Sequence, residues 1–151
     1  MGLRSPRSAL AHRQGDPTIG ALKLISFNLG LSAVAYAAFY LGPDSYTRLM
    51  RTPEQALAQV SIVQYVEGLG PVWPFLFALA GGLVLGTTYV GRGVIIGHGI
   101  AAGVWVFFGL AIMLGSLLSV PPTPVLSGAA AIFGAITHVG MARAWAGEGV
   151  K

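Results

Sequence analysis

Two histidines, His98 and His138, are the side chains in this sequence with the clearest capacity for chemistry. Each lies within a long apolar segment, where an ionisable group is costly and therefore marks a candidate functional position. If the two segments form antiparallel helices, a rise of about 1.5 Å per residue places both imidazoles about 8–10 Å from the same end. We therefore expect that the two side chains can meet.

A histidine pair could sense pH, bind a metal or relay protons. The alternative, which we favour, is that each ring is neutral and hydrogen-bonded to a threonine or a backbone carbonyl. Two histidines without a carboxylate make a poor metal site compared with the usual three or four ligands. The chain also has no cysteine, which excludes thiolate ligands and disulfides. We predict no metal site and no cofactor.

Other polar groups in the apolar segments do not complete a catalytic site. Asn28 and Thr87 join the histidines as intramembrane polar candidates, but no Asp or Glu lies within any apolar segment. Ion-coupled transporters and proton relays usually depend on such a carboxylate. Ser26, Ser32, Ser116, Ser119 and Ser127 have no base at a motif spacing. We predict that the protein is not an enzyme and has no catalytic residues.

The segments that must position these groups are membrane spans. Only 9% of the residues are charged and 54% are hydrophobic, whereas a soluble domain usually carries about 25% charged residues. Four stretches are near the length of about 20 residues that crosses a bilayer: residues 19–41, 72–90, 93–119 and 124–145. The sequence predicts an all-α fold, an integral membrane four-helix bundle that forms one transmembrane domain over residues 1–151.

The distribution of basic residues predicts the orientation of these spans. With four spans, seven basic residues fall on one side, which we assign to the cytoplasm; they are Arg4, Arg7, Arg13, Lys23, Arg92, Arg143 and Lys151. Both ends of the chain are then cytoplasmic. An alternative is that the first span is a signal peptide cleaved near Ala35 or Ala37. Tyr40, Tyr46, Tyr65 and Trp73 fit an outer aromatic belt, and Tyr89 and Trp145 an inner one.

Residues 43–70 connect the first two spans and contain a helix signal. Thr52 is the expected N-cap, Pro53 follows at the first helical position, and Gln55 completes a capping box. Apolar residues then recur at helical spacing as far as Gly68, which can end the helix. We predict a short amphipathic, extra-cytoplasmic helix at the membrane surface. It is either a connector that covers the bundle or a surface for docking a partner or perturbing the membrane.

Small residues in the spans favour close helix packing. Several form GxxxG pairs or lie on the small-residue face of the last span, and we take them as packing or oligomerisation candidates: Gly82, Gly86, Gly93, Gly97, Gly99, Gly103 and Gly134. They either pack within one bundle or drive self-association. The lipid bilayer is the expected partner, together with other copies of the chain or a second membrane protein. No basic patch with aromatic platforms suggests binding to nucleic acid.

Several features resemble small four-span, holin-like membrane proteins of actinobacterial phages. They are Asp44-Ser45-Tyr46 and Leu49 after the first span, Trp73 at the start of the second, and the run from Ala80 to Val84. The glycine/arginine turn and the proline-rich turn before an Ala/Gly-rich last helix also fit. The resemblance implies a protein that oligomerises in the bacterial cytoplasmic membrane and permeabilises it during host cell lysis. Two alternatives stay open: a non-catalytic accessory or structural subunit of a bacterial membrane complex, and a small carrier or channel.

Overall fold

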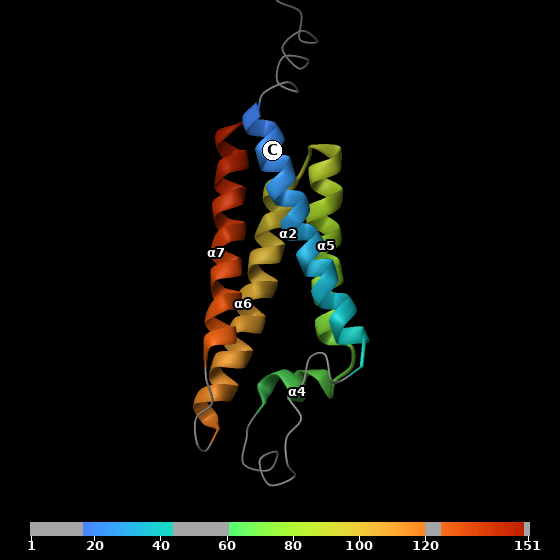
Figure 1. Cartoon of the computed structure of the whole chain (residues 1–151), viewed down its shortest axis with the longest axis vertical. Coiled ribbons are helices and arrows are strands. Elements are labelled where there is room, and N and C mark those ends of the chain that lie inside the picture. The colour runs from blue at the N-terminus through green and yellow to red at the C-terminus, as the bar shows by residue number, and fades with distance from the viewer. Residues whose placement is uncertain (1–16, 44–60, 120–124, 150–151) are drawn as a thin grey trace, which may run out of the picture.

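Helices account for nearly all of the chain that the computed structural model describes, which is residues 17–43, 61–119 and 125–149. The helices are α2 (Pro17–Leu41), α4 (Ile62–Glu67), α5 (Val72–Val90), α6 (Val94–Leu118) and α7 (Leu126–Gly147). Within the described ranges there is no β-strand. Figure 1 shows four long helices side by side, with α4 lying across one end. The predicted all-α fold is confirmed.

The limits of the long helices follow from local turn chemistry. Pro17 occupies the first position of α2, where its missing N–H costs nothing. Gly91 and Gly93 have φ of 72° and 73° in the turn between α5 and α6. This left-handed conformation is open to glycine at little cost, so α5 stops and α6 starts within three residues. The predicted Thr123-Pro124 cap lies outside the described residues, and α7 begins after Val125.

Three of the helices, α2, α5 and α6, are long and apolar enough to cross a membrane. The fourth, α7, has a comparable length of 22 residues but a less apolar, Gly- and Ala-rich sequence, and it is not among them. By length and composition, these three candidate spans indicate a membrane protein.

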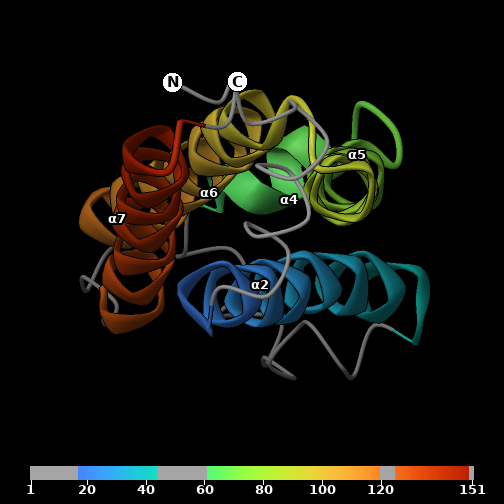
Figure 2. The ribbon, with the colours of Figure 1, turned by 90° about the horizontal axis from the view of Figure 1, so that it is seen from above.

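The long helices pack as two pairs that follow each other along the chain. In the first pair, a Cβ built on Gly81 of α5 would lie 2.6 Å from the carbonyl oxygen of Gly30 in α2. In the second, a Cβ on Gly109 of α6 would lie 2.9 Å from the carbonyl oxygen of Gly128 in α7. The backbones therefore touch where both partners lack a side chain, as in other closely packed membrane helices. Helix α2 starts beside α7 and ends beside α5 (Figures 1 and 2).

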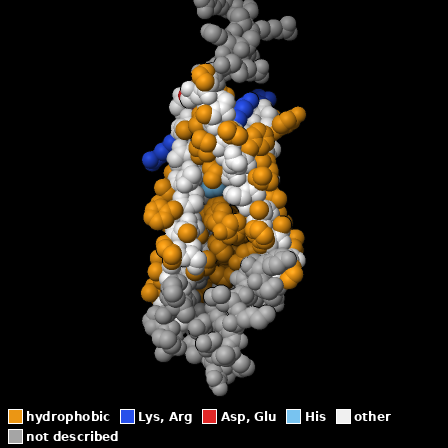
Figure 3. Space-filling model, viewed as in Figure 1, with side chains coloured by type: hydrophobic (Ala, Val, Ile, Leu, Met, Phe, Trp, Pro, Cys, Tyr) orange, Lys and Arg blue, Asp and Glu red, His pale blue; other side chains and the backbone are white. Residues whose placement is uncertain are grey.

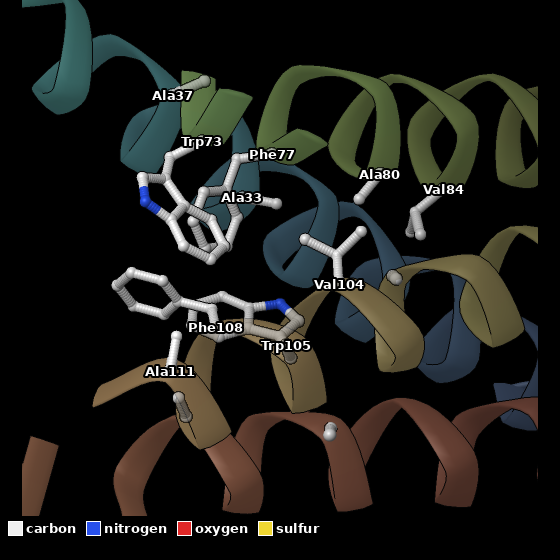
Figure 4. Packing of buried hydrophobic residues seen from close by; sticks show 13 residues of the cluster. Ala33, Ala37, Trp73, Phe77, Ala80, Val84, Val104, Trp105, Phe108 and Ala111 are labelled. Atoms are coloured by element: carbon white, nitrogen blue, oxygen red, sulfur yellow. The ribbon is translucent and has the colours of Figure 1, made fainter. Parts of the chain in front are cut away.

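The interior contains a large aromatic cluster towards the end covered by α4. Phe77 of α5 lies with its ring centroid 5.1 Å from that of Trp105 and 5.2 Å from that of Phe108, both on α6. These separations and steep interplanar angles are the edge-to-face geometry that aromatic rings prefer. Small residues of α2 and α7, among them Ala33 and Ala131, complete this core (Figure 4).

The opposite end carries the basic side chains of the described helices and is called here the basic end. Lys23, Arg92 and Arg143 belong to it, and Figure 3 shows Lys and Arg gathered there. A second, smaller apolar cluster lies inside it, formed by Val94 of α6 with Met141 and Trp145 of α7 and adjoined by residues of α2. The core is therefore divided into two apolar clusters.

Helix α4 differs from the predicted connector helix. Ser61 is the N-cap of α4, with an extended backbone (φ −119°, ψ 101°) and a side chain that accepts a hydrogen bond from the Gln64 N–H. A single helix running from Thr52 through Ser61 is therefore wrong, because the serine ends any helix before it and starts a new one. Gly68 is the C-cap, as predicted. The expected start at Thr52 lies outside the described residues.

Candidate functional site

A chain of four polar side chains lies between the two apolar clusters and joins three helices. The indole N–H of Trp145 (α7) donates to Ser26 Oγ (α2) over 3.0 Å. Ser26 Oγ lies 2.9 Å from Nε2 of His98 (α6), and His98 Nδ1 lies 2.9 Å from Nδ1 of His138 (α7). We call these four residues the polar chain. The two histidines do meet, and Ser26 and Trp145 extend their contact to α2.

Local packing explains why these residues come together. Ser26 lies one helical turn before Gly30, the residue at which α2 touches α5. His98 follows Gly97, where a Cβ would lie 3.3 Å from the Leu83 carbonyl oxygen of α5. His138 and Trp145 are seven residues apart on α7, about two turns, and so share a face. The close approaches at the glycines bring side chains from different helices within hydrogen-bonding distance.

The polar chain is almost completely shielded. Ser26 and His98 are 0% exposed, and His138 and Trp145 are each 1% exposed. Buried polar groups are stable only when they are hydrogen-bonded, so the chain satisfies groups that would otherwise weaken the core. Two other buried atoms, Thr88 Oγ1 and Trp105 Nε1, have no hydrogen-bond partner in the described part of the protein.

The donors and acceptors of the chain allow two arrangements of protons when both histidines are neutral. An indole N–H can only donate, so Ser26 Oγ accepts from Trp145 in both. In the first, Ser26 donates to His98 Nε2 and His98 Nδ1–H donates to His138 Nδ1. In the second, His138 Nδ1–H donates to His98 Nδ1, and His98 Nε2–H donates to Ser26. Each arrangement requires exactly one proton between the two Nδ1 atoms.

In the sequence, no base lies at a motif spacing from Ser26. The fold nevertheless brings a base, the His98 imidazole, within hydrogen-bonding distance of the Ser26 hydroxyl. A hydroxyl on Nε2, with a second group on Nδ1, is also the order of atoms in nucleophilic serine sites. Here, however, the hydroxyl oxygen accepts the Trp145 N–H and is 0% exposed. In this packing the chain serves to join helices, because no substrate carbonyl can approach Ser26.

The structure contains no group of three or more His, Cys, Asp or Glu that could hold a metal ion among the residues it describes.

The remaining polar candidates do not join the chain. Asn28 is exposed on the outside of α2, and its amide donates to the Leu24 carbonyl of its own helix over 2.9 Å. Thr87 is half-buried and donates to the Leu83 carbonyl of its own helix over 2.6 Å. A Cβ on Gly97 would lie 2.7 Å from the Thr87 hydroxyl oxygen, so this threonine forms part of the contact between α5 and α6.

The candidate glycines separate into packed and open positions. Gly97 lies in the α5–α6 contact, Gly93 in the turn, and Gly134 has space for a Cβ in ordinary contact 3.4 Å from the Trp105 ring. The other four are exposed, and a Cβ on any of them would meet nothing within 4 Å; they are Gly82, Gly86, Gly99 and Gly103. Two GxxxG pairs, one on α5 and one on α6, thus form open notches on the outer surface.

Two tryptophans predicted to lie in the aromatic belts are buried instead. Trp145 donates to Ser26, and Trp73, which is 0% exposed, donates its indole N–H to the Val63 carbonyl of α4 over 3.0 Å. A buried indole needs a partner for its N–H, and both have found one inside the protein. In the sequence, the feature that could indicate that Trp145 belongs with the histidines is its spacing of seven residues from His138, which places both on one face of α7.

With the site described, comparison with known proteins adds no relative. The chain matches no protein-family model, no curated protein and no solved structure.

Proposed function

We propose that this protein is a holin-like membrane protein, which self-associates in the cytoplasmic membrane of a bacterium and permeabilises it. In this proposal α7 joins α2, α5 and α6 as a fourth span. The basic end faces the cytoplasm, because positively charged residues favour that side. Helix α4 then lies at the outer surface.

The observation that carries the proposal is the pair of open glycine notches. Gly86 on α5 and Gly99 on α6 each lie about 8–9 Å along their helices from the intervening turn, and Gly82 and Gly103 about 14–15 Å. Large exposed apolar side chains flank both notches, including Phe75 and Leu79 on α5 and Ile96 and Phe107 on α6. Glycine notches at one depth allow helices of neighbouring copies to approach closely, which is the usual basis of helix association in lipid.

The notch on α6 provides a direct test. Gly99→Leu and Gly103→Leu fill the notch at two exposed positions where an added Cβ meets nothing within 4 Å. We expect the double variant to insert normally but to delay or abolish the collapse of membrane potential during induced expression. Gly20→Leu on α2 is the matched control, since this glycine also has open space but lies outside both notches.

The readout is the fluorescence of a potential-sensitive dye, followed with culture density and with membrane levels of each variant. Wild type and Gly20→Leu should lose potential suddenly, at the same reproducible time. Unchanged timing in the double variant, at equal membrane levels, contradicts the proposal. Cross-linking in the membrane at the same time points reports whether self-association has been lost.

The sealed polar chain favours a second candidate, a non-catalytic subunit of a larger membrane complex. A water-filled lesion lined by His98 and His138 would require the bundle to unpack, because both are buried by their own chain. A structural subunit needs no such rearrangement. It predicts that expression alone leaves the membrane potential intact and that a defined partner stays bound in a mild detergent.

A further inference from the structure

The two helix pairs are joined along one edge and separable along another. The turn Gly91–Gly93 ties α5 to α6, and Gly97 packs against Leu83 and Thr87 along that contact. The opposite edge is between α2 and α7, which have no turn between them. Figures 1 and 2 show α2 beside α7 at the basic end and crossing towards α5 at the other end. A rotation of one pair against the other would therefore open the α2–α7 edge first.

The α2–α7 edge is held at the basic end. A hydrogen bond crosses it from Trp145 to Ser26, and Ile19 and Leu22 pack against the cluster of Met141 and Trp145. Beyond this contact Figure 3 shows a hollow lined by hydrophobic side chains, with a histidine visible at its upper rim. The polar chain therefore lies at the boundary between the packed part of the α2–α7 edge and this hollow.

We infer that the polar chain is a proton-sensitive contact, and that uptake of a second proton by the histidine pair separates α2 from α7 at the basic end. One added proton is accommodated, because a cationic His98 donates from Nε2 to Ser26 and from Nδ1 to His138. A second proton places two N–H groups against each other across 2.9 Å, with no acceptor between them. The Nδ1–Nδ1 bond is then lost and the two rings repel.

The other described ionisable side chains at the basic end are few, and none of them is a carboxylate that bonds to the pair. At the basic end α2 contributes Lys23, the end of α5 and its turn contribute Tyr89 and Arg92, and α7 contributes Arg143, with Glu148 just beyond it. Helix α6 contributes no ionisable side chain besides His98. The only other carboxylate in the described residues is Glu67, on α4 at the far end. Since α6 and α7 are in backbone contact at Gly109 and Gly128, the rings separate most easily by His98 leaving Ser26. That movement removes one of the two hydrogen bonds from Ser26 to the second helix pair, so the bond from Trp145 is left to hold α2.

The absence of cysteine allows spin labels to be placed at chosen sites. Gly20→Cys with Gly140→Cys spans the α2–α7 edge, and a Cβ at either position meets nothing within 4 Å. Two further pairs use exposed positions as internal controls: Gly20→Cys with Tyr89→Cys across α2 and α5, and Ile96→Cys with Gly140→Cys across α6 and α7. The full-length protein is placed in lipid nanodiscs, with an excess of unlabelled chain to suppress distances between copies.

Electron–electron distance measurements at about pH 8 and about pH 3 bracket the range in which shielded histidines take up protons, because burial favours the neutral ring. We expect the Gly20–Gly140 distance to lengthen at the lower pH while both control distances stay constant. His138→Gln keeps a hydrogen-bonding side chain but cannot take the second proton, so its distance should not respond to pH. Ser26→Ala should lengthen the same distance at both pH values.

An unchanged Gly20–Gly140 distance in wild type overturns the inference, and so does a pH response that persists in His138→Gln. Unchanged control distances show that each variant remains folded. The measurement does not depend on loss of membrane potential, so its outcome and that of the proposed permeabilisation are independent.

Discussion

Gly81 and Gly82 are adjacent residues of α5 whose replacement by alanine should have opposite consequences. The Cβ of Gly81→Ala would lie 2.6 Å from the Gly30 carbonyl oxygen, 2.8 Å from Cγ2 of Val34 and 2.9 Å from its backbone nitrogen. Two of these three atoms belong to the backbone of α2 and cannot rotate away. The Cβ of Gly82→Ala would meet nothing within 4 Å.

The size of the effect follows from the distance that α2 must move. Ordinary contact begins at 3.4 Å, so relief of the 2.6 Å contact requires the two backbones to separate locally by about 0.8 Å. A gap of about 0.5–1 Å removes roughly a quarter to a half of the dispersion energy at a contact. Overpacking of this kind typically costs about 1–3 kcal/mol. Both variants gain the same helix propensity, so this amount is the expected difference between them.

The buried tryptophans Trp73, Trp105 and Trp145 supply the assay, because their fluorescence changes when the bundle opens. Unfolding by sodium dodecyl sulfate from mild detergent micelles gives the free energy of unfolding of each variant. Gly82→Ala should equal or slightly exceed wild type, and Gly81→Ala should be less stable. Equal midpoints for the two variants would refute the conclusion that α2 and α5 meet backbone to backbone at Gly81.

Three further predictions use the same unfolding assay or a local one. Trp145→Phe removes the N–H donor together with part of a buried ring, and the share of the lost stability due to the hydrogen bond should be about 0.5–1 kcal/mol. The loss should therefore be smaller by this amount when Ser26→Ala is already present; an equal loss would mean that the two residues are not coupled. Trp73→Phe should increase hydrogen exchange in α4, since it removes the bond to the Val63 carbonyl; unchanged exchange in α4 would contradict a role for this bond in holding the helix. Gly97→Ala would bring a Cβ within 2.7 Å of the Thr87 hydroxyl, so Thr87→Ala should recover about 1 kcal/mol of the stability lost; additive effects would place these residues apart.

The sequence is sufficient to predict the helices wherever turn chemistry marks their ends. The predicted 72–90 segment coincides with α5 because Gly91 can adopt positive φ, and the 93–119 segment differs from α6 by one residue at each end. The predicted connector helix continues through Ser61, whereas α4 begins there with Ser61 as its extended N-cap. A serine fits a helix interior as well as an N-cap, so apolar spacing alone does not show where a helix is interrupted.

The candidate site is only partly predictable. His98 and His138 can be paired from sequence because antiparallel helices place them at one depth, but the register that brings Ser26 to His98 depends on glycine contacts between helices. Periodicity identifies residues that share a helix face without showing which face is inward. Gly81 therefore packs against α2 while Gly82, the next residue and the one with the GxxxG spacing, is exposed.

The pairing of helices also fixes an order of assembly during synthesis. Helices α2 and α5 both precede α6 in the chain, so their interface at Gly30 and Gly81 can form while the second pair is still being translated. At about 5–20 residues per second, the interval between the end of α5 and the end of α7 lasts about 3–11 s. The bonds of Ser26 to His98 and Trp145 need both pairs and so form last. Until α6 and α7 are made, the Ser26 hydroxyl in the ribosome-bound first pair has neither His98 nor Trp145 to bond with.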